Sequence, residues 1–325
     1  MKLTPLFTTL ILSVSALHSP AVLAQNFPSK AVKLITPFPV GSGPEGVLRL
    51  LAEQLSRKWG QPVIVDNKPG ANGFIAIEQV KRAPADGHEL VQMDTSQMTV
   101  YPSLFKKIPY DLDKDFEPIL PLFSNYFMVT VGKDSKYQTV AELLTDAKSN
   151  PGKVNFGSWS VGNPVHIASG MLATASDTQM QHVTYKETSA LYIAVANKEL
   201  DWALGSVGTA GALQRADKIR YLATTAPKRQ AGWPQVPTVE EAGGPKGFEF
   251  SAWTALVSPK GVPASVLDKL HKDISEVINT PEMKAKFAAL AYDAYPMSRG
   301  QFSQLLKRET ERNGRVVKQL NLQLD

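Results

Sequence analysis

The chain has 325 residues, a formal net charge of +5 at pH 7 and no cysteine. Without cysteine it cannot form disulfides, zinc–thiolate centres, a cysteine nucleophile or the cysteine-linked anchor of a lipoprotein. Its lysines and arginines are dispersed, and no basic stripe with interleaved aromatic residues predicts a nucleic-acid partner. A chain of this length can bury enough apolar surface to fold without disulfides, and its size is typical of two domains.

The first residues have the pattern of a signal peptide for export. Lys2 gives a positive start, residues 6–17 form an apolar stretch, and residues 22–24 place small side chains where a signal peptidase cleaves. We therefore expect residues 1–24 to be a signal peptide, the mature chain to begin near Gln25, and the protein to be secreted to the periplasm. No later stretch approaches the ~20 apolar residues of a membrane-spanning helix.

The first third of the mature chain alternates apolar strands with helices. In the first helix Val47, Leu51 and Leu55 recur at helical spacing, and Gly60 ends it. Strands and helices that alternate over short turns predict a parallel, doubly wound sheet. The predicted strands cover 31–38, 62–66 and 88–93, and the predicted helices cover 45–59 and 74–82.

The same alternation begins again near residue 126. Thr139 and Ser298 are the predicted N-caps of the helices that they precede. Two helices, 264–279 and 299–320, are expected to finish the chain. The other predicted elements are strands at 126–131, 154–157, 181–185, 202–204, 219–224 and 248–258, a helix at 139–147 and a helix from Pro164.

This order predicts two α/β lobes, with the second inserted into the first. Residues 25–125 and 250–325 are assigned to the first lobe, and residues 126–249 to the second. Each lobe is expected to contain a doubly wound, mostly parallel sheet, and the terminal helices are expected to pack on the first lobe.

Two loops carry the strongest functional signal. Residues 41–44 and residues 158–164 each follow a strand and lead into a helix. Open α/β sheets bind ligands at the carboxyl ends of their strands, and Pro44 and Pro164 stand where a helix start needs no backbone donor. Because helix N-termini attract anions, two that face each other across a cleft suit a ligand with a carboxylate at each end. Each loop could also be an ordinary strand-to-helix turn.

The first loop also matches the dinucleotide-binding pattern G-x-G-x-x-G. Residues 41–46 supply the glycines, and Asp66 lies 66 − 46 = 20 positions beyond the last of them. A nucleotide-binding oxidoreductase of Rossmann type is therefore the alternative function. Export away from cytosolic cofactors, the donor lost at Pro44 and the charge of Glu45 beside a pyrophosphate all disfavour it.

A hydrolase has less support. Residues 158–162 nearly match the nucleophile elbow G-x-S-x-G, with Ser158 in place of the first glycine. His166 and His182 could act as bases, but His166 is better explained as a polar residue one turn into a helix. The five histidines show no metal-ligand spacing such as H-E-x-x-H. We therefore expect no catalysis, no metal and no cofactor.

Short motifs follow one another along the chain in a fixed order. Residues 38–45 (F-P-V-G-S-G-P-E) look like F-P-x-G-G-x-x-D, residues 65–73 (V-D-N-K-P-G-A-N-G) like V-x-N-[RK]-P-G-A-x-G, and residues 85–88 (A-D-G-H) like P-D-G-Y. Residues 109–116 match P-Y-D-x-x-x-D-F, and residues 157–158, 182–186 and 236–239 fit G-S, H-V-P-Y-K and V-P-T. In this order the mature chain resembles, almost end to end, the periplasmic solute receptors of tripartite tricarboxylate transporters, which are receptors of the Bordetella-uptake-gene type.

The resemblance implies a two-lobed, Venus-flytrap receptor that closes on a small carboxylate around a hinge and has no catalytic activity. It implies integral membrane subunits of a tripartite transporter as partners, and we expect a monomer. In the family, the first and second strand-to-helix loops hold one carboxylate through backbone amides and ordered waters. The match assigns ligand contact to Phe38, Val40, Gly41, Thr95, Ser96 and Ser158, and more loosely to Asn163 and His166. The predicted site also includes Ser42, Glu45, Trp159, Gly205 and Ser206.

Departures from the family pattern indicate the kind of ligand. Many relatives have Asp where this chain has Gly205, and Glu45 replaces the usual Asp. Loss of the acid at 205 argues against a ligand amino group, and Gly205 is expected to open space in the cleft. Trp159 and Phe38 offer flat faces on which a ring could stack. We expect an extended dicarboxylate, with an aromatic one such as terephthalate ahead of succinate, adipate or citrate.

Overall fold

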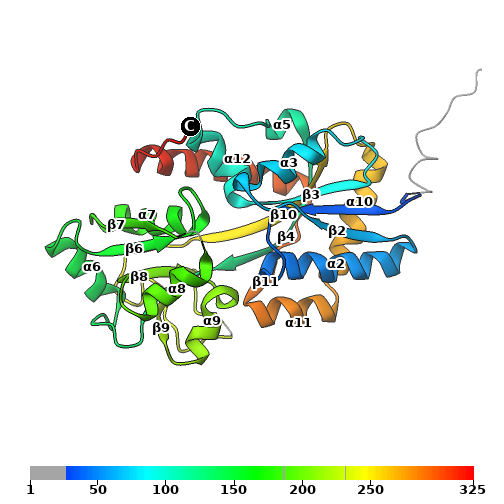
Figure 1. Ribbon diagram of the computed structural model, residues 1–325. Coiled ribbons are helices and arrows are strands. Elements are labelled where there is room, and N and C mark those ends of the chain that lie inside the picture. Colours follow the sequence, from blue (N-terminus) through cyan, green and yellow to red (C-terminus); the bar gives the residue numbers. More distant parts are fainter. Residues whose placement is uncertain (1–26, 186, 231) are drawn as a thin grey trace, which may run out of the picture.

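The computed structural model describes residues 27–185, 187–230 and 232–325, so the predicted signal peptide lies outside the described residues. The chain forms two α/β lobes that lie side by side, each built on its own sheet (Figure 1). Within the described ranges, no helix has the length and apolarity needed to cross a membrane.

The first lobe contains a six-stranded sheet with the order β11–β4–β10–β3–β1–β2. Strand β1 pairs in parallel with β2 and β3, whereas β10 pairs antiparallel with β3 and β4, and β11 antiparallel with β4. The strands are β1 (Val32–Thr36), β2 (Val63–Asn67), β3 (Glu89–Asp94), β4 (Phe116–Tyr126), β10 (Ser251–Pro259) and β11 (Tyr292–Ala294).

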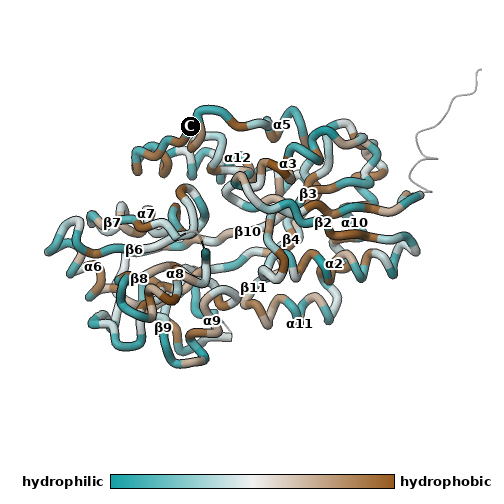
Figure 2. Tube along the Cα trace, in the orientation of Figure 1, coloured by the Kyte–Doolittle hydropathy of each residue, from teal (hydrophilic) through white to brown (hydrophobic). Residues whose placement is uncertain are grey.

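Helices cover both faces of this sheet because successive strand residues point to opposite sides. Leu34 packs in the apolar layer formed with α2, α10 and α11, whereas Ile35 packs in the layer formed with α3 and α12. Apolar segments at α3, β3 and α10 mark these layers in Figure 2. The helices are α2 (Gly43–Trp59), α3 (Phe74–Lys81), α10 (Ala264–Ile278), α11 (Pro281–Leu290) and α12 (Arg299–Gln319), with short turns η1 (Ala71–Gly73), η2 (Ser96–Val100), α4 (Tyr101–Leu104) and α5 (Leu112–Asp115).

The second lobe contains a five-stranded sheet with the order β7–β6–β8–β5–β9. Strand β6 pairs in parallel with β7 and β8, and β5 pairs antiparallel with β8 and β9. One apolar layer includes residues of α6 and α7, and another includes residues of α8 and α9. The elements are β5 (Met128–Gly132), α6 (Val140–Ser149), β6 (Asn155–Ser158), α7 (Pro164–Ala175), β7 (Gln181–Thr184), α8 (Thr188–Ala196), β8 (Trp202–Gly205), α9 (Val207–Arg215) and β9 (Ile219–Thr224).

The chain crosses between the two sheets twice. Phe127 alone separates β4 from β5, and the return from β9 to β10 passes through Thr225. Helix α12 spans the junction, because it packs against η2 and α4 of the first lobe and against α7 of the second. Leu320, just beyond α12, lies against Gly170 of α7, where even a Cβ atom would overlap it.

The predicted two-lobed α/β fold is confirmed, and so are the N-caps Thr139 and Ser298, whose side chains accept bonds from Glu142 N and Gln301 N. Several details of the prediction were wrong, and β11, α8 and α9 were not predicted. Strand β4 was missed because Pro118 and Pro121 interrupt its pattern; the antiparallel pairing with β10 slips in register there. Antiparallel pairs are therefore more numerous than expected. Three helices finish the chain, because Thr280 caps an additional one, α11.

Candidate ligand-binding site

Three of the helices that follow a strand begin beside predicted site residues: α2 after β1, α7 after β6 and α9 after β8. Asn163 caps α7 by accepting a hydrogen bond from His166 N, and Ser206 caps α9 in a reciprocal box with Thr209. Ser42 stands at the cap of α2, yet its side chain makes no cap bond. Of the three helix starts, α2 is the one whose amides no N-cap side chain satisfies, so it is the best suited to bind an anion.

Two predicted hydroxyl groups at the first sheet are buried without a partner. The Oγ atoms of Ser42, after β1, and Ser96, after β3, make no hydrogen bond within the described chain. Buried hydroxyls almost always have a partner. These two therefore indicate a position for a ligand or water at the carboxyl ends of β1 and β3.

The Glu45 side chain turns back onto the first loop. Its carboxylate is 2% exposed, accepts a hydrogen bond from Gly41 N at 3.1 Å and pairs with the guanidinium of Arg49. Gly41 has φ +83°, a backbone conformation that glycine adopts without strain. The Gly41 amide, predicted to face the ligand, is thus engaged by the protein's own carboxylate. A pyrophosphate would meet a negative charge there, which disfavours the nucleotide alternative.

The motif at the end of β2 fixes the first loop. Asn67 donates to the Phe38 carbonyl at 2.9 Å and accepts from Arg49 at 2.9 Å. The Phe38 amide donates to the hydroxyl of Thr36 at 3.2 Å. Phe38 is half-buried, and Val40 is 72% exposed at the tip of the loop. The two family motifs therefore form one network that sets the loop's shape.

Thr95 and Asp94 mark the end of β3. The Thr95 hydroxyl accepts from Trp253 N at 2.8 Å and donates to Trp253 O at 3.1 Å, so it closes the ladder to β10. Asp94 accepts from Gln97 N at 2.9 Å, and burial raises its pKa to about 6. Asp94 was not among the site residues predicted from the sequence. The only signal was a lone acid at the end of an apolar strand.

The second loop is held by its own side chains. Ser158 has no exposed surface; its hydroxyl donates to Ser160 O at 2.9 Å and lies 2.7 Å from His182 Nε2. Asn163 Nδ2 also donates to Ser160 O at 2.6 Å, and Gly162 N donates to His166 Nδ1 at 3.0 Å. Direct contact of Ser158 with a ligand remains a prediction, because its one proton is already donated within the loop.

The two histidines form a stacked, neutral pair. Their ring centroids are 3.9 Å apart at 12°, and Phe156 lies beside His182 with a centroid separation of 5.1 Å. Burial, then the neighbouring His182, lowers the pKa of His166 to about 3, and burial lowers the pKa of His182. Although Ser158 and His182 have the separation of a nucleophile and a base, the Ser158 hydroxyl is buried and donates to Ser160 O, so it is not poised to attack a substrate.

The expectation of open space at Gly205 was wrong. A Cβ atom there would approach Tyr192 and Ala210 to 3.0 Å and Thr130 to 3.2 Å. A side chain at 205 would therefore enter the interior of the second lobe, not an empty cleft. Trp159 is half-buried and packs against both apolar layers of this lobe, so only part of its ring is available to a ligand.

The predicted residues thus form separate groups. One group joins Phe38, Gly41, Ser42 and Glu45 around the start of α2, and another joins Ser158, Asn163 and His166 before α7. The second group touches the first lobe at Gly162, where a Cβ atom would overlap Leu104. The described residues contain no group of three or more acidic or histidine side chains placed to hold a metal ion.

Comparison with known proteins identifies the family. The sequence model of the tripartite tricarboxylate transporter family receptor matches residues 47–322. The chain belongs to this family. Its members are periplasmic solute-binding receptors, so the prediction of a receptor and not an enzyme is confirmed.

Individual relatives agree with this assignment. The UPF0065 protein in the tcbD-tcbE intergenic region of Pseudomonas sp. (strain P51) is 30% identical and covers 91% of this chain and 88% of its own. The periplasmic binding protein BugD is 26% identical, with a TM-score of 0.78 over 92% of this chain and 100% of that one. MatC from Rhodopseudomonas palustris, solved with bound malate, is 25% identical, with a TM-score of 0.78 over 90% and 100%.

Glu45→Gln should strengthen carboxylate binding at the first loop. The substitution removes a buried negative charge beside the proposed anion position and weakens the hydrogen bond that Gly41 N donates to this side chain. Repulsion between unit charges about 4 Å apart in water is about 1 kcal/mol, so affinity should rise about fivefold. Isothermal calorimetry measures the dissociation constant of the carboxylate, with Glu53→Gln on the exposed side of α2 as the control. Weaker binding would mean that the carboxylate itself contacts the ligand.

The histidine pair should make stability depend on pH. Both folded-state pKa values lie below the ordinary 6.5, so the unfolded chain binds protons that the folded chain does not. Stability is therefore complete above about pH 6.5 and decreases as the pH falls toward about 3, by up to about 1.4 kcal/mol per pH unit for each ring.

The test compares the fall in Tm between about pH 7 and about pH 5. His166→Asn keeps an acceptor for the Gly162 amide but does not titrate, so its fall should be shallower than that of the wild type. Equal slopes in His166→Asn and the wild type would contradict the assignment.

Proposed function

We propose that this receptor captures a small carboxylate, and specifically an extended dicarboxylate, for the integral membrane subunits of a tripartite transporter. The observation that carries the proposal is the start of α2, where no N-cap side chain satisfies the helix amides and the Ser42 hydroxyl is buried without a partner in the described chain. A helix start of this kind favours an anion. The malate bound to MatC, a relative of similar fold, supports the choice of a dicarboxylate.

Within this class, we propose a rigid or aromatic dicarboxylate such as terephthalate. Trp159 and Phe38 are half-buried, so each keeps some ring surface for a ligand. Stacking of a ring can contribute about 0.5–1.5 kcal/mol beyond the burial of area. A flexible aliphatic acid such as succinate or adipate is the alternative, favoured by the packing of Trp159 against its own lobe.

The same proposal includes how the chain is organised around the ligand. The first lobe, residues 25–125 with 250–325, would move against the second lobe, residues 126–249. This division is supported by which strands belong to each of the two sheets. The receptor would act as a monomer in the periplasm after removal of residues 1–24. The predicted contact residues, from Phe38 to Ser206, belong to this proposal too.

A ligand screen tests the proposed function directly. Thermal shift followed by calorimetry of the mature chain should show that terephthalate and malate raise Tm and bind without turnover. Benzoate serves as the matched monocarboxylate, and succinate, adipate and citrate test length and flexibility. Benzoate binding as tight as terephthalate would contradict the need for two charges, and a clear preference for adipate would remove the stacking role of Trp159.

Ligand binding should bring the lobes together. A carboxylate that contacts both lobes has more contacts in the closed form, and it must shift the population toward that form. Small-angle scattering of the mature chain should therefore give a smaller radius of gyration at saturating ligand. An unchanged radius at saturation would contradict closure around the two crossings near Phe127 and Thr225.

A further inference from the structure

Tyr292 lies in β11, at the edge of the first sheet and beside the second lobe. Its ring stacks on Phe123 with centroids 4.4 Å apart at 3°, and its backbone pairs with Asn125 of β4. The residue is 7% exposed. The ring position is therefore fixed by the first lobe.

The hydroxyl of Tyr292 reaches two helix starts. A Cβ atom on Gly43, the first residue of α2, would overlap the hydroxyl oxygen, and one on Gly208, in the first turn of α9, would lie 3.6 Å from it. Helix α2 belongs to the first lobe and α9 to the second. Because both positions are glycines, the hydroxyl can approach both helix starts, which come from different lobes.

The Tyr292 residue is more than nine-tenths buried, and its hydroxyl makes no side-chain hydrogen bond to another residue of the described ranges. A buried phenol hydroxyl normally finds a partner. The Oγ atom of Ser42, the residue before Gly43, is buried and unpaired there. Two unpaired hydroxyls beside one uncapped helix start indicate an oxygen-rich group that accepts hydrogen bonds from both.

An anion fits this position better than a neutral group. Burial raises the pKa of Tyr292, so the phenol keeps its proton and can donate it. The amides at the start of α2 are donors too. Donors without matching acceptors favour a carboxylate, whose oxygens only accept.

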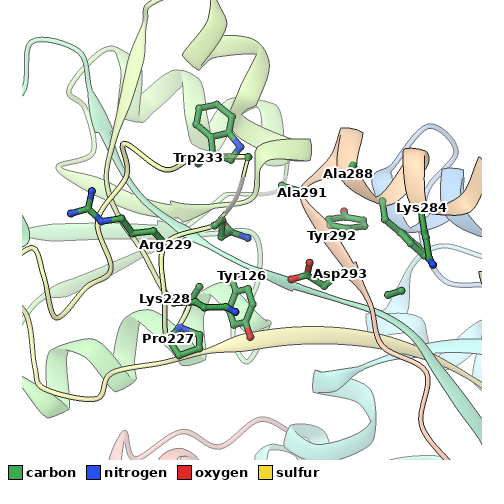
Figure 3. A pocket seen from close by; sticks show the side chains of 15 residues that line it. Tyr126, Pro227, Lys228, Arg229, Trp233, Lys284, Ala288, Ala291, Tyr292 and Asp293 are labelled. Carbon is green, nitrogen blue, oxygen red and sulfur yellow. The ribbon is translucent and has the colours of Figure 1, made fainter. Parts of the chain in front are cut away.

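A cavity lies beside Tyr292. Tyr292 forms part of the wall of a space of about 550 Å³ between α11 and β11 of the first lobe and residues 226–233 of the second. In Figure 3 the Tyr292 ring lies between Ala288 and Asp293, with Tyr126 and Lys228 across the space. Lys228, Arg229 and Lys284 line the cavity together with one acid, Asp293, so the charged lining is net positive and favours an anion.

We propose that Tyr292 is a ligand-binding and specificity-determining residue, whose hydroxyl donates a hydrogen bond to a ligand carboxylate held between the starts of α2 and α9. This inference rests on the proposed function and adds a contact from the last strand of the chain. Since Tyr292 belongs to the first lobe and α9 to the second, the same carboxylate joins the two lobes. The contact therefore favours the closed form as well as the ligand.

Tyr292→Phe tests the inference by removing the hydroxyl and keeping the ring stacked on Phe123. Calorimetry with malate, adipate and terephthalate should show about ten- to a hundredfold weaker binding, the usual effect of losing a hydrogen bond to a charged group. Melting without ligand should remain close to that of the wild type. Tyr221→Phe is the matched control, because the Tyr221 hydroxyl is buried and unpaired in the described chain and lies against the body of α9 near Gly211.

Gly43→Ala gives a second, independent variant. The added methyl group would displace the hydroxyl, so it should weaken binding in the wild type and add little in the Tyr292→Phe background. Unchanged affinity in Tyr292→Phe, or an equal loss in Tyr221→Phe, would overturn the role of Tyr292 while leaving the proposed function intact. A wild-type chain that binds none of the three carboxylates would instead overturn the proposed function, and this inference with it.

Discussion

Thr225 ties together the two segments that connect the lobes. Its amide donates to Phe127 O at 2.8 Å, and its carbonyl accepts from Phe250 N at 3.0 Å. Its hydroxyl accepts from Phe127 N at 2.9 Å and donates to Phe250 O at 2.7 Å. Thr225 is fully buried, so these bonds do not compete with water. Together with α12, which packs across the junction, Thr225 sets the relative position of α2 and α9, which belong to different lobes.

The three helix starts differ in what they can offer an anion. Asn163 and Ser206 satisfy the first amides of α7 and α9 with their own side chains, as most N-caps do. Ser42 has the right residue type for a cap but does not form one. A missing cap leaves a helix end less stable by roughly 0.5–2 kcal/mol, and a bound carboxylate restores that interaction. The least stable helix start is thus the one best prepared for a ligand.

Local patterns predicted much of the fold but little of the site. The spacing of Val47, Leu51 and Leu55 predicted α2, and Thr139 and Ser298 predicted two helix starts, because each signal lies within a few neighbouring residues. The proximity of Gly43 and Tyr292 could not be predicted in this way, since 249 positions (292 − 43) separate them and only the pairing of β11 with β4 brings them together. The same holds for Gly205, whose neighbours Tyr192 and Thr130 come from another helix and another strand.

The glycines of the first loop show how one sequence pattern can occur in binding sites of different chemistry. In a dinucleotide site, the G-x-G-x-x-G turn leaves its amides free for a pyrophosphate. Here Glu45 lies inside the pattern and its carboxylate accepts the Gly41 amide, while Arg49 and Asn67 hold that carboxylate and the Phe38 carbonyl in one network. The second glycine of the pattern, Gly43, has a different role. Because it has no side chain, the Tyr292 hydroxyl can lie against it. The loop is thus shaped by its own acid and by a distant tyrosine, and its Gly41 amide is not free for a pyrophosphate.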